Sequence, residues 1–191
     1  GSSDNEITDY ELKENTKAQN YKITPEKGTL TVTALEGDDR LAVTVTAKSL
    51  QTTYNGSEQK VEGYDVSGLL KGHTLSGLSA SANGTDAGEY ASVLTGDVKI
   101  VDENNVDVTA QYKVTQVNGK LTINPVEITV KAADASKPYD GTALTANDYS
   151  IIKGTFVGDE GFASVTVVGS QTVVGSSDNE ITDYELKENT K

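Results

Sequence analysis

The chain begins and ends with the same seventeen residues. Residues 1–17 read GSSDNEITDYELKENTK, and the same letters recur at residues 175–191. The period of this repeat, from Gly1 to Gly175, is therefore 174 residues. The second copy follows Gln171-Thr-Val-Val174 without a break, so we interpret both copies as parts of a repeated protein and not as a cloning tag. Such a repeat restricts the chain to folds built from recurring units.

A weaker repeat lies within the long one. Three pairs of short segments match: residues 21–32 with 112–123, Thr53-Tyr-Asn-Gly-Ser57 with Pro138-Tyr-Asp-Gly-Thr142, and Leu69-Leu-Lys-Gly72 with Ile151-Ile-Lys-Gly154. The last two pairs are separated by 85 and 82 residues, close to half of the long period. Each long unit is therefore predicted to contain two diverged modules of similar length.

The positions of these matches predict the module boundaries. Module A is expected to be complete and to span residues 41–125, and module B is expected to begin at residue 126 and to run to 191. The segment at 112–123 has no counterpart in module B, but it has one within residues 1–33. We therefore interpret residues 1–33 as the C-terminal part of a preceding module B, residues 34–40 as a linker, and residues 126–191 as a truncated module B.

Apolar and polar residues alternate with a period of two. Leu41, Val43 and Val45 share one predicted face, as do Val126, Ile128 and Val130. Turns are predicted at four Asn-Gly or Asp-Gly steps, the third of which closes a hairpin over residues 112–123: Asn55-Gly56, Asn83-Gly84, Asn118-Gly119 and Asp140-Gly141. We expect an all-β fold of tandem small β-sandwich modules of the Ig-like kind in an elongated arrangement, with β-grasp-like modules as the alternative.

One short motif supports a sandwich. Asp86-Ala-Gly-Glu-Tyr90 has the form of a tyrosine corner, in which the tyrosine hydroxyl donates a hydrogen bond to an upstream carbonyl. The alternative is an ordinary turn before a strand that contains Tyr90.

The charge of the chain excludes some partners. The net charge is −13 and the isoelectric point is near 4.4, so we expect no nucleic-acid binding. No run of eighteen apolar residues is present, so we expect no membrane insertion.

The sequence offers little for catalysis. His73 is the only histidine and there is no cysteine, so we predict no enzyme activity, no catalytic residues and no cofactor site, and we expect His73 in a solvated turn. Oxygen-rich clusters are weak candidates for calcium, with a solvated turn as the alternative at each: Asp102, Asn104 and Asp107; Glu36, Asp38 and Asp39; and residues 177–180.

The motifs together resemble a known class of repeats. Tyr-Asp-Gly-Thr at residues 139–142, Asp107-Val-Thr-Ala-Gln-Tyr112 and the motif at 112–123 resemble the MBG and YDG families of bacterial surface repeats. Their order and spacing recur over nearly the whole chain, with Asn55 replacing Asp in module A. The identical ends also resemble the high-identity tandem arrays of periscope adhesins.

This resemblance implies a location and a role. Its members form tandem modules in extracellular, cell-wall-anchored adhesins, often of Gram-positive bacteria, where they act as stalks that project a distal binding domain. The resemblance thus implies a structural spacer whose partners are neighbouring repeats. The alternative is a binding module for host glycan or protein, because sandwich loops and exposed tyrosines suit binding.

The predicted module boundaries lead to one further expectation. Residues 126–191 hold the front of module B and residues 1–33 hold its back. Residues 1–33 of one molecule are therefore expected to complete module B of the next in a head-to-tail association. The alternative is pairing within one chain, which would have to bridge the length of module A.

Overall fold

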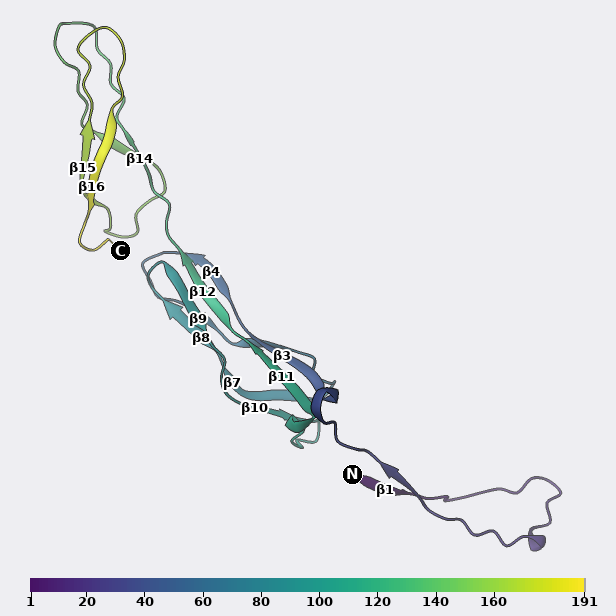
Figure 1. The fold of residues 1–191 in the computed structure, drawn as a ribbon. Coiled ribbons are helices and arrows are strands. Elements are labelled where there is room, and N and C mark those ends of the chain that lie inside the picture. Colours follow the sequence, from purple (N-terminus) through teal and green to yellow (C-terminus); the bar gives the residue numbers. More distant parts are fainter. Residues whose placement is uncertain (191) are drawn as a thin grey trace.

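The computed structural model of the chain, shown in Figure 1, describes residues 1–190 and consists almost entirely of strands. Helical structure within residues 1–190 is limited to short 3₁₀ turns at Ala18–Asn20, Gly37–Asp39 and Thr109–Gln111. The strands are β1 (Ser2–Asn5), β2 (Gly28–Thr31), β3 (Leu41–Ala47), β4 (Leu50–Thr53), β5 (Gln59–Glu62), β6 (Tyr64–Ser67), β7 (Thr74–Ser79), β8 (Ser81–Gly84), β9 (Gly88–Ser92), β10 (Thr95–Val101), β11 (Tyr112–Val117), β12 (Gly119–Asn124), β13 (Thr129–Ala132), β14 (Tyr149–Lys153), β15 (Phe162–Val168) and β16 (Glu180–Leu186). The prediction of an all-β fold is confirmed.

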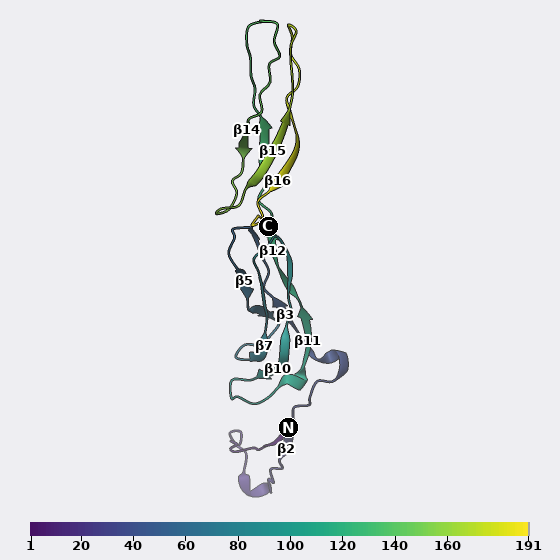
Figure 2. The ribbon, with the colours of Figure 1, turned by 90° about the vertical axis from the view of Figure 1, so that its left-hand side faces the viewer.

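The strands pair in three separate groups. The first contains β1 and β2, the second β3 to β12, and the third β13 to β16. Between the groups, the described part of the chain has no strand pair. Figures 1 and 2, which differ by a quarter turn, show the groups one after another along an elongated molecule.

The second group, which lies within module A, contains five extended lines of two consecutive strands each. The lines are β3–β4, β5–β6, β7–β8, β9–β10 and β11–β12. In the half nearer the N-terminus, β11, β3 and β6 form one sheet, while β7 and β10 form another. In the other half, β4, β12 and β9 form one sheet, while β5 and β8 form another. The first and fifth lines run parallel to each other through both halves.

Apolar side chains between these sheets form the core of module A. Val43, Val45 and Ala47 alternate along β3 and are buried, which confirms the inward face predicted for Val43 and Val45. Three clusters follow the long axis of the module: Val43, Ile100 and Tyr112; Val45, Ala47, Ala80 and Leu94; and Val61, Ala82, Leu121 and Ile123. The core is therefore long and narrow, and all five lines contribute to it.

The fifth line does not form the predicted hairpin. β11 and β12 continue in one direction and pair with β3 and β4 instead of with each other. A Cβ at Gly119 would lie 2.3 Å from the carbonyl oxygen of Lys48 and 2.5 Å from that of Ala47. The prediction of a turn at Asn118-Gly119 was wrong because Gly119 allows two backbones to approach closely, which is the other common reason for a glycine in a strand.

The structure also corrects one of the predicted sequence matches between modules A and B. Gly68 and Gly154 have φ values of +93° and +78°, and a Cβ on either would meet a carbonyl oxygen of the neighbouring segment at 2.3 and 2.0 Å. Gly154 therefore corresponds to Gly68, and the predicted alignment of residues 151–154 with 69–72 was wrong by four positions.

The bond predicted for the tyrosine corner is confirmed. The Tyr90 hydroxyl donates to the carbonyl of Asp86 at 2.9 Å. Its ring lies against Gly84, where a Cβ would come within 2.3 Å of the ring. Gly84 ends β8, so this glycine makes room for the tyrosine beside the turn.

We predict that Leu121→Ala lowers the free energy of unfolding of module A by about 2–5 kcal/mol, because Leu121 is fully buried. Leu30→Ala is the matched control, since Leu30 holds the same place in the repeat but is 55 % exposed. It should cost less than about 1 kcal/mol in dilute protein. Urea unfolding of both variants checks this, and equal losses would contradict the assignment of the core.

Candidate functional site: the junction between modules A and B

The chain passes from module A to module B through Asn124 and Pro125. Asn124 ends β12, and its carbonyl accepts a hydrogen bond of 2.8 Å from the amide of Tyr54. Proline fixes its own φ and favours extended backbone at the residue before it. The connection therefore leaves β12 in an extended conformation that is held to module A.

Tyr54 also makes the direct contact between the modules. Its hydroxyl donates a hydrogen bond to Oε1 of Glu160, which lies 106 residues further along the chain. The Glu160 carboxylate, helped by partial burial of the hydroxyl, raises the pKa of Tyr54 to about 12. Beside it, a Cβ at Gly56 would lie 2.9 Å from Cγ1 of Val157. The turn that follows Tyr54 thus touches module B.

A cavity of about 460 Å³ opens beside this contact. Module A contributes Tyr54 and Ala87 to its wall, and module B contributes apolar side chains that include Ile128, Phe156 and Leu186. The residues of the contact therefore also line a cavity between the modules, together with apolar side chains of module B.

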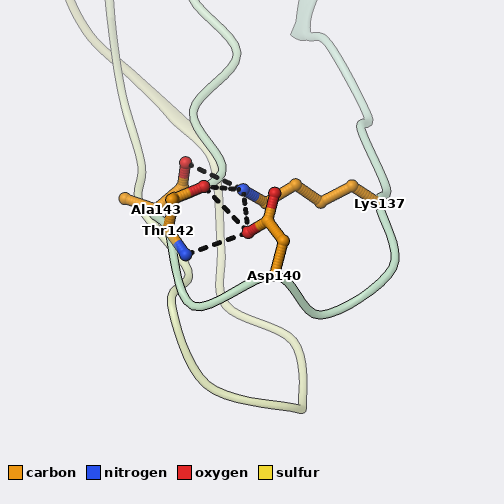
Figure 3. A network of polar contacts seen from close by, with 4 residues as sticks. All are labelled: Lys137, Asp140, Thr142 and Ala143. Atoms are coloured by element: carbon orange, nitrogen blue, oxygen red, sulfur yellow. Dashed lines mark hydrogen bonds and ion pairs between the residues drawn. The ribbon is translucent and has the colours of Figure 1, made fainter.

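The counterpart of this turn in module B is held by one ion pair and several hydrogen bonds. Lys137 Nζ lies 2.9 Å from Asp140 Oδ1 and 2.6 Å from the Thr142 hydroxyl, and Figure 3 draws both contacts as dashed lines. Asp140 Oδ1 also accepts from the amide and the hydroxyl of Thr142, at 2.9 and 2.8 Å. In module A, Asn55 Oδ1 accepts from the Ser57 amide at 2.9 Å, so Asn and Asp form the same turn.

The predicted linker contacts the other end of module A. The Leu35 amide donates to Gln111 Oε1 at 2.8 Å, and Lys113 pairs with Asp38 at 2.6 Å. Arg40 Nε donates to the Gly37 carbonyl at 3.0 Å. Residues 34–40 therefore lie against the start of the fifth line.

The first calcium candidates lie in a turn. Asp102 Oδ1 accepts from the amides of Asn104 and Val106, both at 2.9 Å, and Asp107 Oδ1 accepts from the Thr109 amide at 2.9 Å. These bonds, the Thr109 amide foremost, lower the pKa of Asp107.

The remaining candidates are not brought together either. The Asp38 side chain is 95 % exposed and pairs with Lys113, and the Asp39 amide donates to the Glu36 carbonyl at 3.1 Å. Over residues 1–190, no three His, Cys, Asp or Glu side chains gather as a metal site would require. The calcium sites stay predictions.

His73 differs from its expected place in a solvated turn. It is half-buried, and its Nδ1 lies 2.8 Å from the hydroxyl of Tyr112. The rings meet edge to face at 5.8 Å, and the same hydroxyl accepts from the Leu70 amide at 3.3 Å. His73 therefore helps to anchor the loop before β7 to the fifth line.

Sequence reasoning missed Glu160 and Val157. The Tyr-Asn-Gly motif at residues 54–56 was recognised as a turn, but no local pattern links it to a loop in the other module. The only available signal was the recurrence of the motif in both modules.

Comparisons with known proteins add no relatives: no protein-family model, curated protein or solved structure matches this chain. Within residues 1–190, no helix has the length and apolar character needed to cross a membrane.

We predict that the Asp140 carboxyl titrates near pH 2. Lys137 and then the amide and hydroxyl of Thr142 lower the pKa of Asp140 from 3.8 to about 2, so the bonds of this turn stabilise the fold above pH 3.8 and are lost as the pH falls through about 2. Carbon-detected NMR titration checks this. Lys137→Met should move the midpoint towards 3.8, while Lys131→Met, which removes the same charge elsewhere, should leave it unchanged. A wild-type midpoint near 3.8 would contradict the assignment.

Proposed function

We propose that the chain is a spacer segment of an extracellular, cell-wall-anchored bacterial adhesin, built from tandem β-sandwich modules of the MBG and YDG type. In this role it holds a distal binding domain away from the cell. The observation that carries the proposal is the parallel pairing of the first and fifth lines of module A. Because both lines run in one direction, the chain enters the module at one end and leaves it at the other.

This course of the chain suits a stalk. The first line spans residues 41–53, which corresponds to roughly 40 Å of extended strand. When such modules follow one another in a chain, each one lengthens the stalk by its full long axis. Tension on the ends would load the β3–β11 and β4–β12 hydrogen bonds together in shear, whereas a hairpin pulled at its open end loses its bonds one by one.

The junction supports the same role. Pro125 limits the conformations of the connection, and the bond from Tyr54 to Glu160 adds a second attachment beside it. Two attachments restrict bending more than a single covalent link, since the second must break before the modules can swing apart.

Charge and repetition also favour a spacer. A net charge of −13 favours the solubility of an exposed stalk. The seventeen-residue duplication is explained by a series of units and has no role in a single binding site.

Small-angle X-ray scattering of the monomeric full chain tests the proposal. We expect the pair-distance distribution of a rod, with a short cross-section and a long tail. Measurement at a concentration where sedimentation shows only monomer keeps association from lengthening the particle. A compact particle would overturn the spacer.

We also predict that Tyr54→Phe loosens the junction, because it removes the bond to Glu160. The chain has no cysteine, so spin labels can be placed through Ser81→Cys in module A and Ser164→Cys in module B. The distance distribution between the labels, measured by double electron–electron resonance, should broaden in Tyr54→Phe. Tyr139→Phe, the same change in the equivalent motif, should leave it unchanged. Equal widths in all three proteins would show that the bond does not restrain the junction.

A further inference from the structure

One edge of module B has no strand partner. In module A, β3 pairs with β6 on one side and with β11 on the other. β13 corresponds to β3, because Val130 pairs with Ile151 as Val45 pairs with Val66. β13 pairs only with β14 among the described strands. The edge that β11 covers in module A is therefore open in module B.

The duplicated segment makes a different pairing in each copy. In module A, the fourth line pairs through β9 with β12 and through β10 with β7. The first copy pairs only through its front, as β1 with β2. The second copy pairs only through its rear, as β16 with β15. Each copy thus makes one half of the pairing that the fourth line makes in module A.

The first copy already uses the register of module A. Asn5 pairs with Gly28, and Leu30 pairs with Ser3. In module A, Gly119 pairs with Ser92, and Leu121 pairs with Tyr90. Residues 28–31 therefore recognise the sequence Ser-Ser-Asp-Asn in the same way as β12 recognises β9. That sequence recurs at residues 176–179, which form no strand in module B.

A second cavity, of about 600 Å³, lies where β12 would be in module B. Residues 135–138 and 175–179 line it, and they are the counterparts of β4 and β9, between which β12 lies in module A. Asn179 joins three segments that line this cavity, because its Nδ2 donates to the carbonyls of Ala133 and Ala146, both at 2.9 Å.

The N-terminal segment carries the matching strand with its apolar face uncovered. Tyr21, Leu30 and Val32 are 64, 55 and 78 % exposed. The residues in the same places of module A are 2, 0 and 1 % exposed, and they are Tyr112, Leu121 and Ile123. Residues 21–33 therefore expose the side chains that a fifth line buries.

We propose that residues 21–33 of a second copy of this chain bind along the open edge of β13 and complete module B as its fifth line. Residues 21–26 would run parallel to β13, and residues 28–33 would lie between residues 135–138 and 176–179. Residues 21–33 do not reach this edge within their own molecule, because Figures 1 and 2 place β1 and β2 at the opposite end of the molecule, beyond module A.

The exchange has a favourable physical basis. Strand β2 leaves Ser2–Asn5 of its own chain and pairs with the identical residues 176–179 of the neighbour, so these backbone bonds are replaced in kind. The gain comes from burial of the apolar face of residues 21–33 and from new bonds to β13. The two surfaces differ, so the contact repeats head to tail and does not close.

Matched charge substitutions test the association in the full chain. Leu30→Lys places a charge where the core of module B would be. Thr29→Lys places the same charge on the opposite face, where module A has the exposed Lys120. Sedimentation velocity should show mass growing with concentration for the wild type and Thr29→Lys, while Leu30→Lys stays monomeric. Association of Leu30→Lys to the same extent, or a wild type that stays monomeric at millimolar concentration, would overturn the proposal.

A labelled peptide of residues 18–33 separates the two surfaces. Full-length Leu30→Lys protein keeps its open edge, so it should bind the wild-type peptide in a fluorescence anisotropy titration. The peptide with the same Leu30→Lys change should bind at least about ten-fold more weakly. Equal binding of the two peptides, or binding of neither, would overturn the proposed site.

Cysteine pairs test the register. Thr122 pairs with Gln51 in module A, so Thr31 of one copy is expected opposite Ser136 of another. A mixture of Thr31→Cys and Ser136→Cys proteins should form a disulfide-linked dimer on mild oxidation. Thr31→Cys mixed with Ser164→Cys serves as the control, and equal yields from both mixtures would overturn the register.

Discussion

The parallel ladder between the first and fifth lines is the interaction on which the rest of module A depends. It joins β3 to β11 and β4 to β12, the earliest and latest strands of the module. It also buries Tyr112, which belongs to one core cluster, and Leu121 and Ile123, which belong to another. The module therefore cannot finish its core until its last strand has docked, and contacts between such distant segments form slowly.

The second, third and fourth lines change partners between their two strands, whereas the first and fifth lines stay paired with each other. Gly77 in β7 and Gly96 in β10 lie near a register irregularity of this pair, with φ values of +87° and +105°. A Cβ on Gly77 would lie 2.0 Å from the carbonyl oxygen of Asp97, and one on Gly96 would lie 2.1 Å from that of Gly77. These glycines therefore let the backbones of β7 and β10 approach more closely than residues with a Cβ would allow.

Local chemistry was predictable from the sequence, whereas long-range pairing was not. The alternation around Val43 and Val45 predicted an inward face, and the Asp86–Tyr90 motif predicted the hydroxyl bond. Gly119 was assigned to a turn because a glycine that turns the chain and one that passes close to another backbone look alike in one sequence. The bond from Tyr54 to Glu160 joins groups 106 residues apart, and no periodic pattern encodes such a contact.

The duplicated segment shows why one sequence fits two pairings. Residues 2–5 are strand in the first copy, and their counterparts at 176–179 are not, while Glu180–Leu186 is strand and its counterpart at 6–12 is not. The sequence is the same, so the available partner decides which half pairs: β2 for the front and β15 for the rear. Identity also means that a fifth line cannot distinguish one copy of its target from another by its contacts with that segment alone. The choice between copies must then rest on the neighbours of each copy, of which only module B offers the open edge of β13, and on effective concentration, which favours a strand tethered nearby.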